Sequence, residues 1–383
     1  MADADPPLLA RLAPGVASLD PAAWDKLAGP DDPFLSHAFL SLLEDSNSVG
    51  PDTGWQPAPI LIDGPDGRLT AIAPAYLKSH SQGEYVFDHA WADAWQRAGG
   101  NYYPKLQIAV PFTPVPGRRL LLSDDSQAPA LIAALEAVVE QNGLSSAHAT
   151  FVAPEQIALF ESAGWLIRRD SQFHWFDAGY GDFEGFLDRL SSRKRKDIRK
   201  ERATAQAAVR IESLTGDAIC AEHWDVMWAC YQDTGMRKWG TPYLSREAFT
   251  LLGERMSGKI LLLLAYDRDT GQPLAAALNI IGADALYGRY WGCLADVPCL
   301  HFELCYYQAI DFALAHGLTR VEAGAQGSHK LARGYEPVAT WSAHYIPHPG
   351  FRAAIADFLT REVPAAEQES EWLATRMPFR KTD

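Results

Sequence analysis

The chain has 383 residues, of which 48% are hydrophobic and 21% charged, and its formal net charge is -14 at pH 7. This length and composition suffice for one large hydrophobic core or for two cores of ordinary domain size. The acidic balance argues against a general nucleic-acid coat protein, DNA included, and against an anionic membrane surface as partner, because both need strongly basic faces. Five cysteines without a CxxC pair favour reduced thiols.

The beginning of the chain and its hydropathy argue against secretion and membrane insertion. The N-terminus MADADPPLLARLAPG is acidic and contains proline, so it lacks the basic and apolar regions of a signal peptide. No segment reaches the ~18 consecutive apolar residues that a membrane-spanning helix needs. We therefore expect a cytoplasmic protein without a membrane span, and the sequence leaves open whether it is a monomer or a homodimer.

The first half of the chain alternates predicted strands with predicted helices. Residues 57–80, PAPILIDGPDGRLTAIAPAYLKSH, have the pattern of strands joined by the turn DGPDG, and residues 106–122 add further strand segments. Residues 128–144, APALIAALEAVVEQNGL, have the pattern of a helix that ends at Gly143, since glycine readily takes the left-handed conformation after a helix. The strand-like SSAHATFV follows at residues 145–152.

The second half repeats this alternation after a glycine-rich segment. FDAGYGDF, residues 176–183, predicts the boundary between a unit of residues 1–178 and a unit of residues 179–383. A basic helix is predicted over residues 183–205, and further helices over residues 222–236 and 245–256. Residues 259–294 have the pattern of strands with turns at RDTGQP and GAD. Residues 300–318, LHFELCYYQAIDFALAHGL, predict an aromatic helix closed by Gly317, and the strand TRVEAGA follows.

The two halves share an order of features that indicates an internal repeat. Each half contains a helix closed by Gly-Leu and then a strand, and His148 stands in the first copy where Glu322 stands in the second. In each half, a glycine followed by an aromatic residue stands ten positions before a histidine followed by an aromatic residue. These residues are Gly164, Trp165, His174 and Trp175 in the first half, and Gly334, Tyr335, His344 and Tyr345 in the second. Hairpins followed by helix and strand, present twice, predict an α/β (α+β) fold of two mixed sheets with helices on both faces.

Four long segments, together with this repeated order, resemble the FemAB-like family of predicted N-acyltransferases. They are FLSHAFLSLLEDSNSVGPDTGW, NYYPKLQIAVPFTPVPGRRLL, LHFELCYYQAI and EAGAQGSHKLARGYEP, and the resemblance covers nearly the whole chain. It implies two tandem GNAT-like units that transfer an acyl or aminoacyl group to a small-molecule or peptide amine in a cleft between the units. It also implies a link to peptidoglycan biosynthesis.

The resemblance leaves two acyl donors open, aminoacyl-tRNA as in Fem-type proteins and acyl-CoA as in common GNATs. Common GNATs hold a pyrophosphate with a glycine-rich loop before a helix. The corresponding segment here, WGCLADVPCLHFEL, lacks such glycines and contains Asp296 and Pro298, which argues against CoA in the second unit. TPVPGRR in the first unit is a weak phosphate signal that leaves an acyl-CoA enzyme as the rival. A degenerate GNAT that acts as a binding or scaffold protein is a third alternative.

Candidate catalytic residues follow from the needs of N-acyl transfer, which requires a base for the amine and donors for an oxyanion. Glu322, on the strand VEAGA, is the candidate base; the alternative is a structural carboxylate paired with Arg333 or Arg289. His301 and Glu303, in the first turn of the aromatic helix, are further candidates. Glu303, Tyr307 and Asp311 form a polar row that we expect to line a cleft or to meet a partner charge.

Candidate substrate-binding residues lie in three places. The polar loop after the last strand contributes Gln326, His329, Lys330 and Arg333, and its KxxRGY spacing resembles the FKxxFG motif of Fem proteins, which implies a donor-binding role for Lys330. Two strands contribute Asn279, Arg289, Tyr290 and Trp291, with Arg289 and Trp291 expected on one side and Tyr290 on the other. The first unit contributes Tyr102, Tyr103 and Lys105, for which a core role is the alternative.

The segment from Arg193 to Arg202 is the basic exception in an acidic chain, with seven basic and two acidic residues and a net charge of +5. Arg195 and Arg199 share one helical row and are candidates for binding an anionic ligand such as a diphosphate or an RNA backbone. A solvated helix face is the alternative. No HExxH, CxxC or paired-carboxylate spacing occurs, so we expect no metal site.

Overall fold

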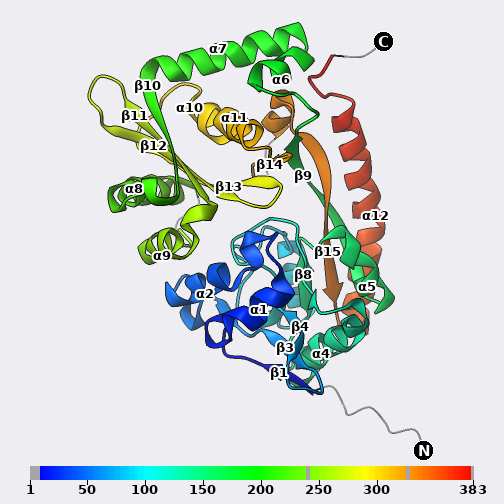
Figure 1. Cartoon of the computed structure of the whole chain (residues 1–383). Helices are drawn as coiled ribbons and strands as arrows, with labels where there is room; N and C mark the ends of the chain where they lie inside the picture. The colour runs from blue at the N-terminus through cyan, green and yellow to red at the C-terminus, as the bar shows by residue number, and fades with distance from the viewer. Residues whose placement is uncertain (1–8, 239–241, 325–327, 381–383) are drawn as a thin grey trace, which may run out of the picture. The chain divides into compact units, whose positions relative to one another are not determined.

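The computed structural model describes residues 9–238, 242–324 and 328–380 (Figure 1). The chain forms two compact units: unit 1 comprises Met1–Asp170 and Ala339–Glu367, and unit 2 comprises Ser171–Val338 and Gln368–Asp383. The C-terminal part of the chain therefore contributes to both units, which the sequence does not indicate. The duplication with a boundary at residues 178 and 179 stays a prediction.

Unit 1 contains two sheets. The smaller sheet is antiparallel in the order β1-β3-β4-β7, formed by Leu9–Leu12, Ile60–Asp63, Leu69–Ala73 and Leu121–Leu122. In the other sheet, β2 (Trp55–Pro57), β5 (Ala75–Lys78), β6 (Lys105–Ile108) and β8 (Ala147–Thr150) lie in this order, followed by the part of β15 (Glu336–Tyr345) that belongs to this unit. Only β6 and β8 pair in parallel among these strands.

In unit 1, the helix predicted over residues 128–144 is confirmed as α4 (Ala128–Gln141). The other helices of this unit, for which no bounds were predicted, are α1 (Pro21–Ala28), α2 (His37–Asp45), α3 (His89–Arg97) and α5 (Ile157–Ser162), and α12 (Pro349–Ala374) begins in this unit. Gly143 follows α4 with φ 61°, as predicted for the residue that ends this helix. The apolar face of α4, including Leu131, Leu135 and Val139, packs into a core with strand residues such as Ile60 and Ile108.

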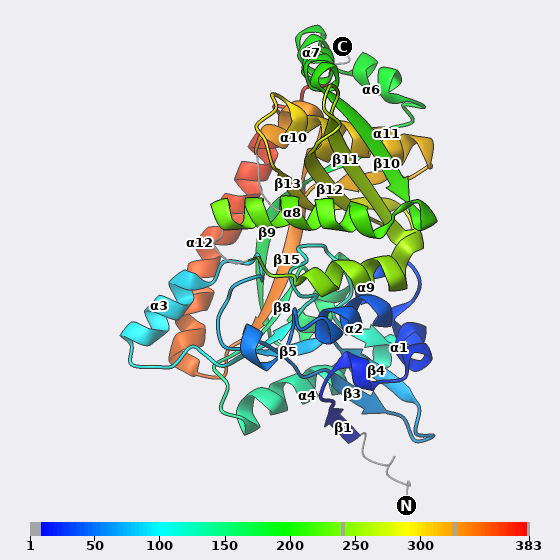
Figure 2. The ribbon, with the colours of Figure 1, turned by 90° about the vertical axis from the view of Figure 1, so that its left-hand side faces the viewer.

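Unit 2 is built on one mixed sheet with helices on both faces, as predicted (Figure 2). The strand order is β10-β11-β12-β13-β14-β9, formed by Val209–Thr215, Ile260–Asp267, Pro273–Ile281, Ala285–Cys293, Arg320–Glu322 and the end of β9 (Leu166–Phe176). Only β13 and β14 pair in parallel among these strands. Helices α8 (Ala221–Lys238) and α9 (Arg246–Met256) cover one face of the sheet, and the aromatic helix covers the other (Figure 1).

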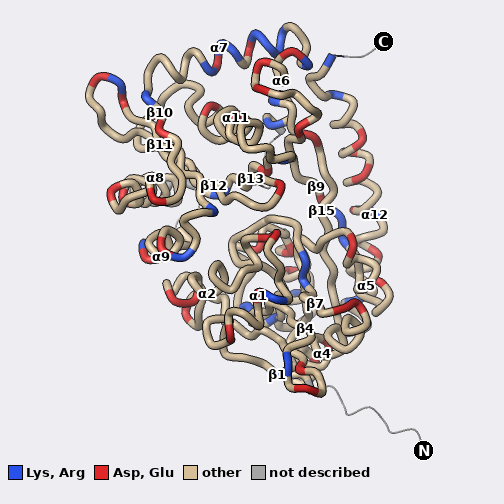
Figure 3. Tube along the Cα trace, viewed as in Figure 1, with Lys and Arg blue, Asp and Glu red and all other residues tan. Residues whose placement is uncertain are grey.

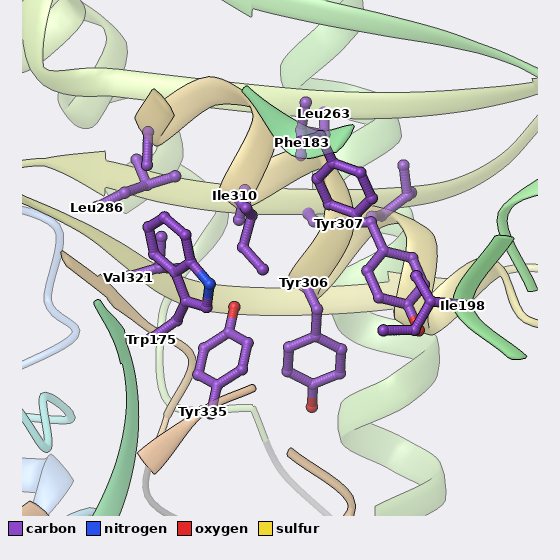
Figure 4. Close-up of a cluster of buried hydrophobic side chains, with 14 of the residues drawn as sticks. Trp175, Phe183, Ile198, Leu263, Leu286, Tyr306, Tyr307, Ile310, Val321 and Tyr335 are labelled. Carbon is purple, nitrogen blue, oxygen red and sulfur yellow. The ribbon is translucent and has the colours of Figure 1, made fainter. Parts of the chain in front are cut away.

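The core of unit 2 lies between this sheet and the aromatic helix (Figure 4). Leu286 and Val321 point from neighbouring strands toward Ile310, because alternate residues of a strand face the same side. Trp175 and Tyr335 complete the cluster and are fully buried. This packing fixes the aromatic helix over β13 and β14.

The predicted basic helix over residues 183–205 is two helices, α6 (Phe183–Arg189) and α7 (Ser192–Ala208), so this prediction is wrong at residues 190 and 191. The chain turns to extended backbone at Leu190, whose side chain is buried in the core. The N–H of Ser191 donates to the carbonyl of Pro378 at 2.9 Å, which holds the break against the C-terminal segment. Burial of one apolar residue therefore interrupts an otherwise helical run.

Unit 1 contains a buried ionic network around Lys105. Lys105 and Lys78 lie directly opposite each other on β6 and β5, and both are fully buried. The Lys105 ammonium donates to Glu84 at 2.8 Å and also to Asp88, both from the segment that follows β5. Two like charges in register repel each other, so these carboxylates are needed to hold the strands together.

The described helices include none that combines the length and the apolar character needed to cross a bilayer.

We expect Asp88→Asn to lower the free energy of unfolding by about 3–5 kcal/mol, because it leaves Lys105 buried with half of its countercharge. The matched control is Asp63→Asn, which removes the partner of the exposed Arg11 and should cost about 0–1 kcal/mol. Urea unfolding followed by circular dichroism measures both values. Equal, small effects of the two substitutions would contradict a structural role for the network.

Candidate functional site

In the sheet of unit 2, β14 is shorter than its neighbour β13 and leaves part of that strand without β14 beside it. The parallel pairing runs from Ala285 opposite Arg320 to Tyr287 opposite Glu322, and β13 then continues to Cys293 without β14 beside it. A cavity of about 110 Å³ lies at this place, which we call the β13 chamber. Strands, the aromatic helix and the segment after β14 all contribute to its lining: Ala277, Leu278, Asn279, Gly288, Arg289, Tyr290, Trp291, His301, Cys305, Tyr306, Ala323 and Gly324.

A β-bulge in β13 shapes the chamber wall. Leu278 pairs with Tyr290 and Asn279 pairs with Gly288, so Arg289 has no counterpart on β12. Tyr290 contacts the ring of Tyr231 at 5.2 Å between centroids, on the α8 side of the sheet. Trp291 instead contacts the ring of His301 at 5.2 Å, on the side of the aromatic helix.

The predicted opposite orientation of Tyr290 and Trp291 is confirmed. Arg289, which was predicted to share the side of Trp291, has its guanidinium carbon 5.4 Å from the centroid of the Tyr290 ring. The strict alternation of side chains therefore fails at the bulge. All four predicted strand residues, Asn279, Arg289, Tyr290 and Trp291, nevertheless line the chamber.

The aromatic helix contains one π-helical turn, which divides its side chains between two surroundings. It consists of α10 (Leu300–Phe302), the π turn η8 (Glu303–Tyr307) and α11 (Gln308–Ala315). The wider turn places Cys305 and Tyr306 on the chamber, and the Tyr306 hydroxyl bonds Nε2 of His329 at 2.8 Å. Such turns often occur at functional sites. Cys305 and Tyr306 were not predicted as site residues, because no sequence pattern marks a π turn.

Glu303 lies on the other side of this helix, outside the chamber lining. Its fully buried carboxylate accepts from Arg202 of α7 at 3.2 Å and from Gln206 and Gln308 at 2.8 Å each. Arg202 also donates to Asp311 at 2.5 Å. The predicted polar row therefore meets a partner charge, and the surroundings of Glu303 are those of a residue that fixes α7 to the aromatic helix.

Glu322 ends β14 beside the chamber residues Ala323 and Gly324. Its carboxylate lies 2.9 Å from Arg320 Nε and 3.6 Å from Nε2 of His174, its cross-strand neighbour on β9. Burial, helped by the charges of Arg320 and Lys330, lowers the pKa of His174 to about 3, so this imidazole is neutral at pH 7. The sequence alternatives named Arg333 or Arg289 as the partner of Glu322, and the observed partner is Arg320.

The loop after β14 contains one buried lysine. Lys330 donates from Nζ to the carbonyl of Gly324 at 2.5 Å, and burial lowers its pKa from 10.5 to about 8. Arg333 pairs with Glu201 of α7 at 2.9 Å and stacks on Phe302. His329 is exposed, and besides its bond to Tyr306 its ring lies 6.2 Å from that of His301 and 6.0 Å from that of Phe302, between centroids. Gln326 lies outside the described residues.

A second cavity, of about 340 Å³, lies against α7, and we call it the α7 cavity. Its basic lining residues are Lys194, Lys200 and Arg333. Figure 3 shows Lys and Arg positions along α7. The predicted anion-binding residues do not line the cavity: Arg195 pairs with Asp188 of α6 at 2.6 Å and Arg199 pairs with Glu184.

The sequence contains a signal that points to the correct face of α7. Ile198 is the only apolar residue between Arg193 and Arg202, and it is buried. Lys194 precedes it by four positions and Glu201 follows it by three, so all three share one side of the helix. The lone apolar residue in a basic run therefore marks the side that faces the protein.

Tyr102, Tyr103 and Lys105 belong to unit 1 and do not line the chamber. Lys105 has its own countercharges within the unit, and the Tyr102 hydroxyl donates to Asp88 at 2.7 Å. Within the described ranges, no group of three or more His, Cys, Asp and Glu side chains is arranged to hold a metal ion.

Comparison with known proteins identifies a family and a fold. The model of the FemAB-like family, described as peptidoglycan biosynthesis/recognition, matches residues 15–381. No curated protein matches the chain.

Solved structures with 10–12% sequence identity share the fold. FemX matches with a TM-score of 0.53 and 12% identity over 88% of this chain and 98% of its own. L-PGS from Bacillus licheniformis matches with a TM-score of 0.51 and 11% identity, over 88% of this chain and 98% of its own. The C-terminal domain of a putative lysylphosphatidylglycerol synthetase from Agrobacterium fabrum matches with a TM-score of 0.54 and 10% identity, over 88% of this chain and 94% of that chain.

We expect the buried ammonium of Lys330 to make stability depend on pH in a defined window. Between pH 8 and 10.5 the unfolded chain holds a proton on this amine that the folded chain has lost, so its contribution to stability rises with pH. Lys330→Met removes this dependence. Between pH 7.5 and pH 10, the free energy of unfolding of the wild type should therefore rise relative to that of the variant. Urea unfolding at several pH values measures both.

The control for this experiment is Lys259→Met, which replaces an exposed lysine of the same unit. Its difference from the wild type should stay constant over the same pH range. A constant difference for Lys330→Met as well would show that the Lys330 amine is not perturbed by burial.

Proposed function

Because the chain belongs to the FemAB-like family of GNAT N-acyltransferases, we propose that unit 2 transfers an acyl or aminoacyl group to an amine, with the acyl group held in the β13 chamber. The observation that carries the proposal is the early end of β14. It leaves an edge of β13 beside a cavity whose lining includes His301, Arg289 and Tyr306. An edge of this kind offers backbone N–H groups to a carbonyl oxygen.

The reaction requires an amine that attacks the acyl carbon and a base that removes its proton. Glu322 is the proposed base, because it ends the strand next to the chamber and its carboxylate lies 2.9 Å from Arg320 Nε. As the new C–N bond forms, the bond from the acyl carbon to the donor oxygen or sulfur breaks. The proton leaves the amine, and the leaving group departs as an alcohol or a thiol.

Lys330 and His301 are proposed to position the reactants. The bond from Lys330 to the carbonyl of Gly324 holds the segment that forms one wall of the chamber. His301 lies between Trp291 and Tyr306, with ring centroids at 5.2 and 5.4 Å. Its ring nitrogens can donate or accept a hydrogen bond, which suits them to contact the acyl oxygen or the leaving group.

Aminoacyl-tRNA is the donor that this proposal favours over acyl-CoA. The segment before the aromatic helix carries Asp296 and Pro298 in place of a glycine-rich loop. The α7 cavity is lined by Asp197 and Glu201 as well as by Lys194, Lys200 and Arg333, and Arg333 pairs with Glu201 at 2.9 Å. The proposal therefore assigns the phosphates of such a donor to Lys194 and Lys200. The family description supports an amine of a peptidoglycan precursor as the acceptor.

We expect Glu322→Gln to lower kcat by at least about 100-fold while KM stays within about threefold, because a general base acts in the transition state. The assay incubates the protein with radiolabelled aminoacyl-tRNAs or acyl-CoAs and peptidoglycan-precursor amines, and mass spectrometry identifies the amide. Glu254→Gln, an exposed carboxylate of the same unit, serves as control. Full activity of Glu322→Gln with an unchanged Tm would exclude this base.

A further inference from the structure

Two lining residues of the α7 cavity, Arg333 and Glu201, bind each other. We infer that the Glu201 carboxylate is an internal competitor, which occupies the guanidinium of Arg333 until a phosphate group of the substrate displaces it. This inference rests on the proposed function, which assigns phosphates to Lys194 and Lys200, and it adds Arg333 and Tyr307 to the phosphate-binding residues.

The Glu201 carboxylate uses only part of the Arg333 guanidinium. Its two oxygens both accept from Nη2 of Arg333, at 2.9 and 3.0 Å. The Nε atom of Arg333 is buried and has no hydrogen-bond partner among the described residues. In a guanidinium group, the N–H bonds of Nε and Nη2 point in the same direction and fit two oxygens of one anion. A phosphate that binds both nitrogens therefore satisfies a donor that Glu201 leaves unused.

Contacts other than the one to Glu201 hold Arg333 in place. Its Nη1 donates to the carbonyl of His329 at 2.9 Å, and its guanidinium carbon lies 3.4 Å from the centroid of the Phe302 ring. The Arg333 side chain is 8% exposed, whereas the Glu201 side chain is 26% exposed and can move toward solvent. Because a buried guanidinium needs a countercharge, we expect Glu201 to leave only when another anion takes its place.

Further donors of the cavity are available to the incoming phosphate. The Tyr307 hydroxyl donates to Glu201 and becomes free when this carboxylate leaves. Lys194 and Lys200 line the cavity and, within the described ranges, form no salt bridge. A phosphate has more oxygens than a carboxylate and carries a higher charge, so it can bind the arginine, the tyrosine and a lysine together. This set of donors favours a phosphate or diphosphate group as the ligand.

The test measures binding of inorganic pyrophosphate to the full chain by isothermal titration calorimetry. Glu201→Gln removes the competing charge and should strengthen binding at least about tenfold, because both parallel donors of Arg333 become available. Asp197→Asn is the matched control, since it removes the same charge from the cavity lining and leaves the partner of Arg333 in place. It should change the affinity by less than about threefold.

The same comparison in an Arg333→Lys background shows whether the gain depends on the two parallel donors. Lysine keeps the charge but lacks these donors, so Glu201→Gln should then strengthen pyrophosphate binding no more than Asp197→Asn does. Circular dichroism establishes that each variant is folded. If Arg333→Lys does not fold, the comparison of Glu201→Gln with Asp197→Asn in the wild-type background decides alone.

Two further probes identify the source of the phosphate. The ribotrinucleotide CCA has the sequence of the tRNA 3′ end, and coenzyme A carries the diphosphate of the rival donor. Since the proposed function favours aminoacyl-tRNA, Glu201→Gln should strengthen binding of CCA more than binding of coenzyme A. A larger gain for coenzyme A would contradict the tRNA donor and support the role of Glu201.

Equal pyrophosphate affinities of the wild type and Glu201→Gln would overturn the inference, as would equal gains for Glu201→Gln and Asp197→Asn. So would the absence of pyrophosphate binding by Glu201→Gln. If Glu201→Gln shows the gain but Glu322→Gln transfers acyl groups at the full rate, the proposed base is wrong and the role of Glu201 stands. If transfer depends on Glu322 but Glu201→Gln leaves pyrophosphate binding unchanged, the role of Glu201 is wrong and the proposed function stands.

Discussion

The parallel register between β13 and β14 ends at the pair of Tyr287 and Glu322, and the site in unit 2 depends on this early end. Gly324, with φ 80°, turns the chain away two residues later in a conformation that most side chains disfavour. The freed length of β13 carries the bulge at Arg289 and borders the chamber. A longer β14 would pair with this edge and leave no space for an acyl group.

The two units use the equivalent strand position differently. In unit 1, His148 on β8 lies opposite His344 on β15, and their Nδ1 atoms are 2.7 Å apart. In unit 2, the corresponding Glu322 lies opposite His174. The histidine pair of unit 1 is fully buried and continues through Tyr102 into the ionic network of Lys105. A position that borders a chamber in unit 2 is therefore filled by hydrogen-bonded side chains in unit 1, which supports chemistry in one unit.

Periodicity and turn residues predicted α4, α8, α9, the aromatic helix and the hairpins, because these depend on neighbours in the sequence. The break at Leu190 and the π turn at Glu303 were not predictable in this way, since distant packing decides both. Arg320 could have been recognised as the partner of Glu322, because residues two apart on a strand share one face. No sequence pattern indicates that residues Ala339–Glu367 belong to unit 1, because this depends on contacts with residues far away in the chain.

If Glu322 is the base, as proposed, its surroundings restrict how the amine can lose its proton. His174 has a pKa near 3, lowered by burial and by Arg320 and Lys330, so it is a poor proton acceptor at neutral pH. A carboxylate such as that of Glu322 is in general a weak base toward an amine, and here Arg320 Nε lies 2.9 Å from it. A weak base removes a proton efficiently only when the amine becomes acidic, which happens as its nitrogen bonds to the acyl carbon. Proton loss should therefore accompany or follow C–N bond formation, and stabilisation of the oxyanion along β13 becomes the larger contribution to the rate.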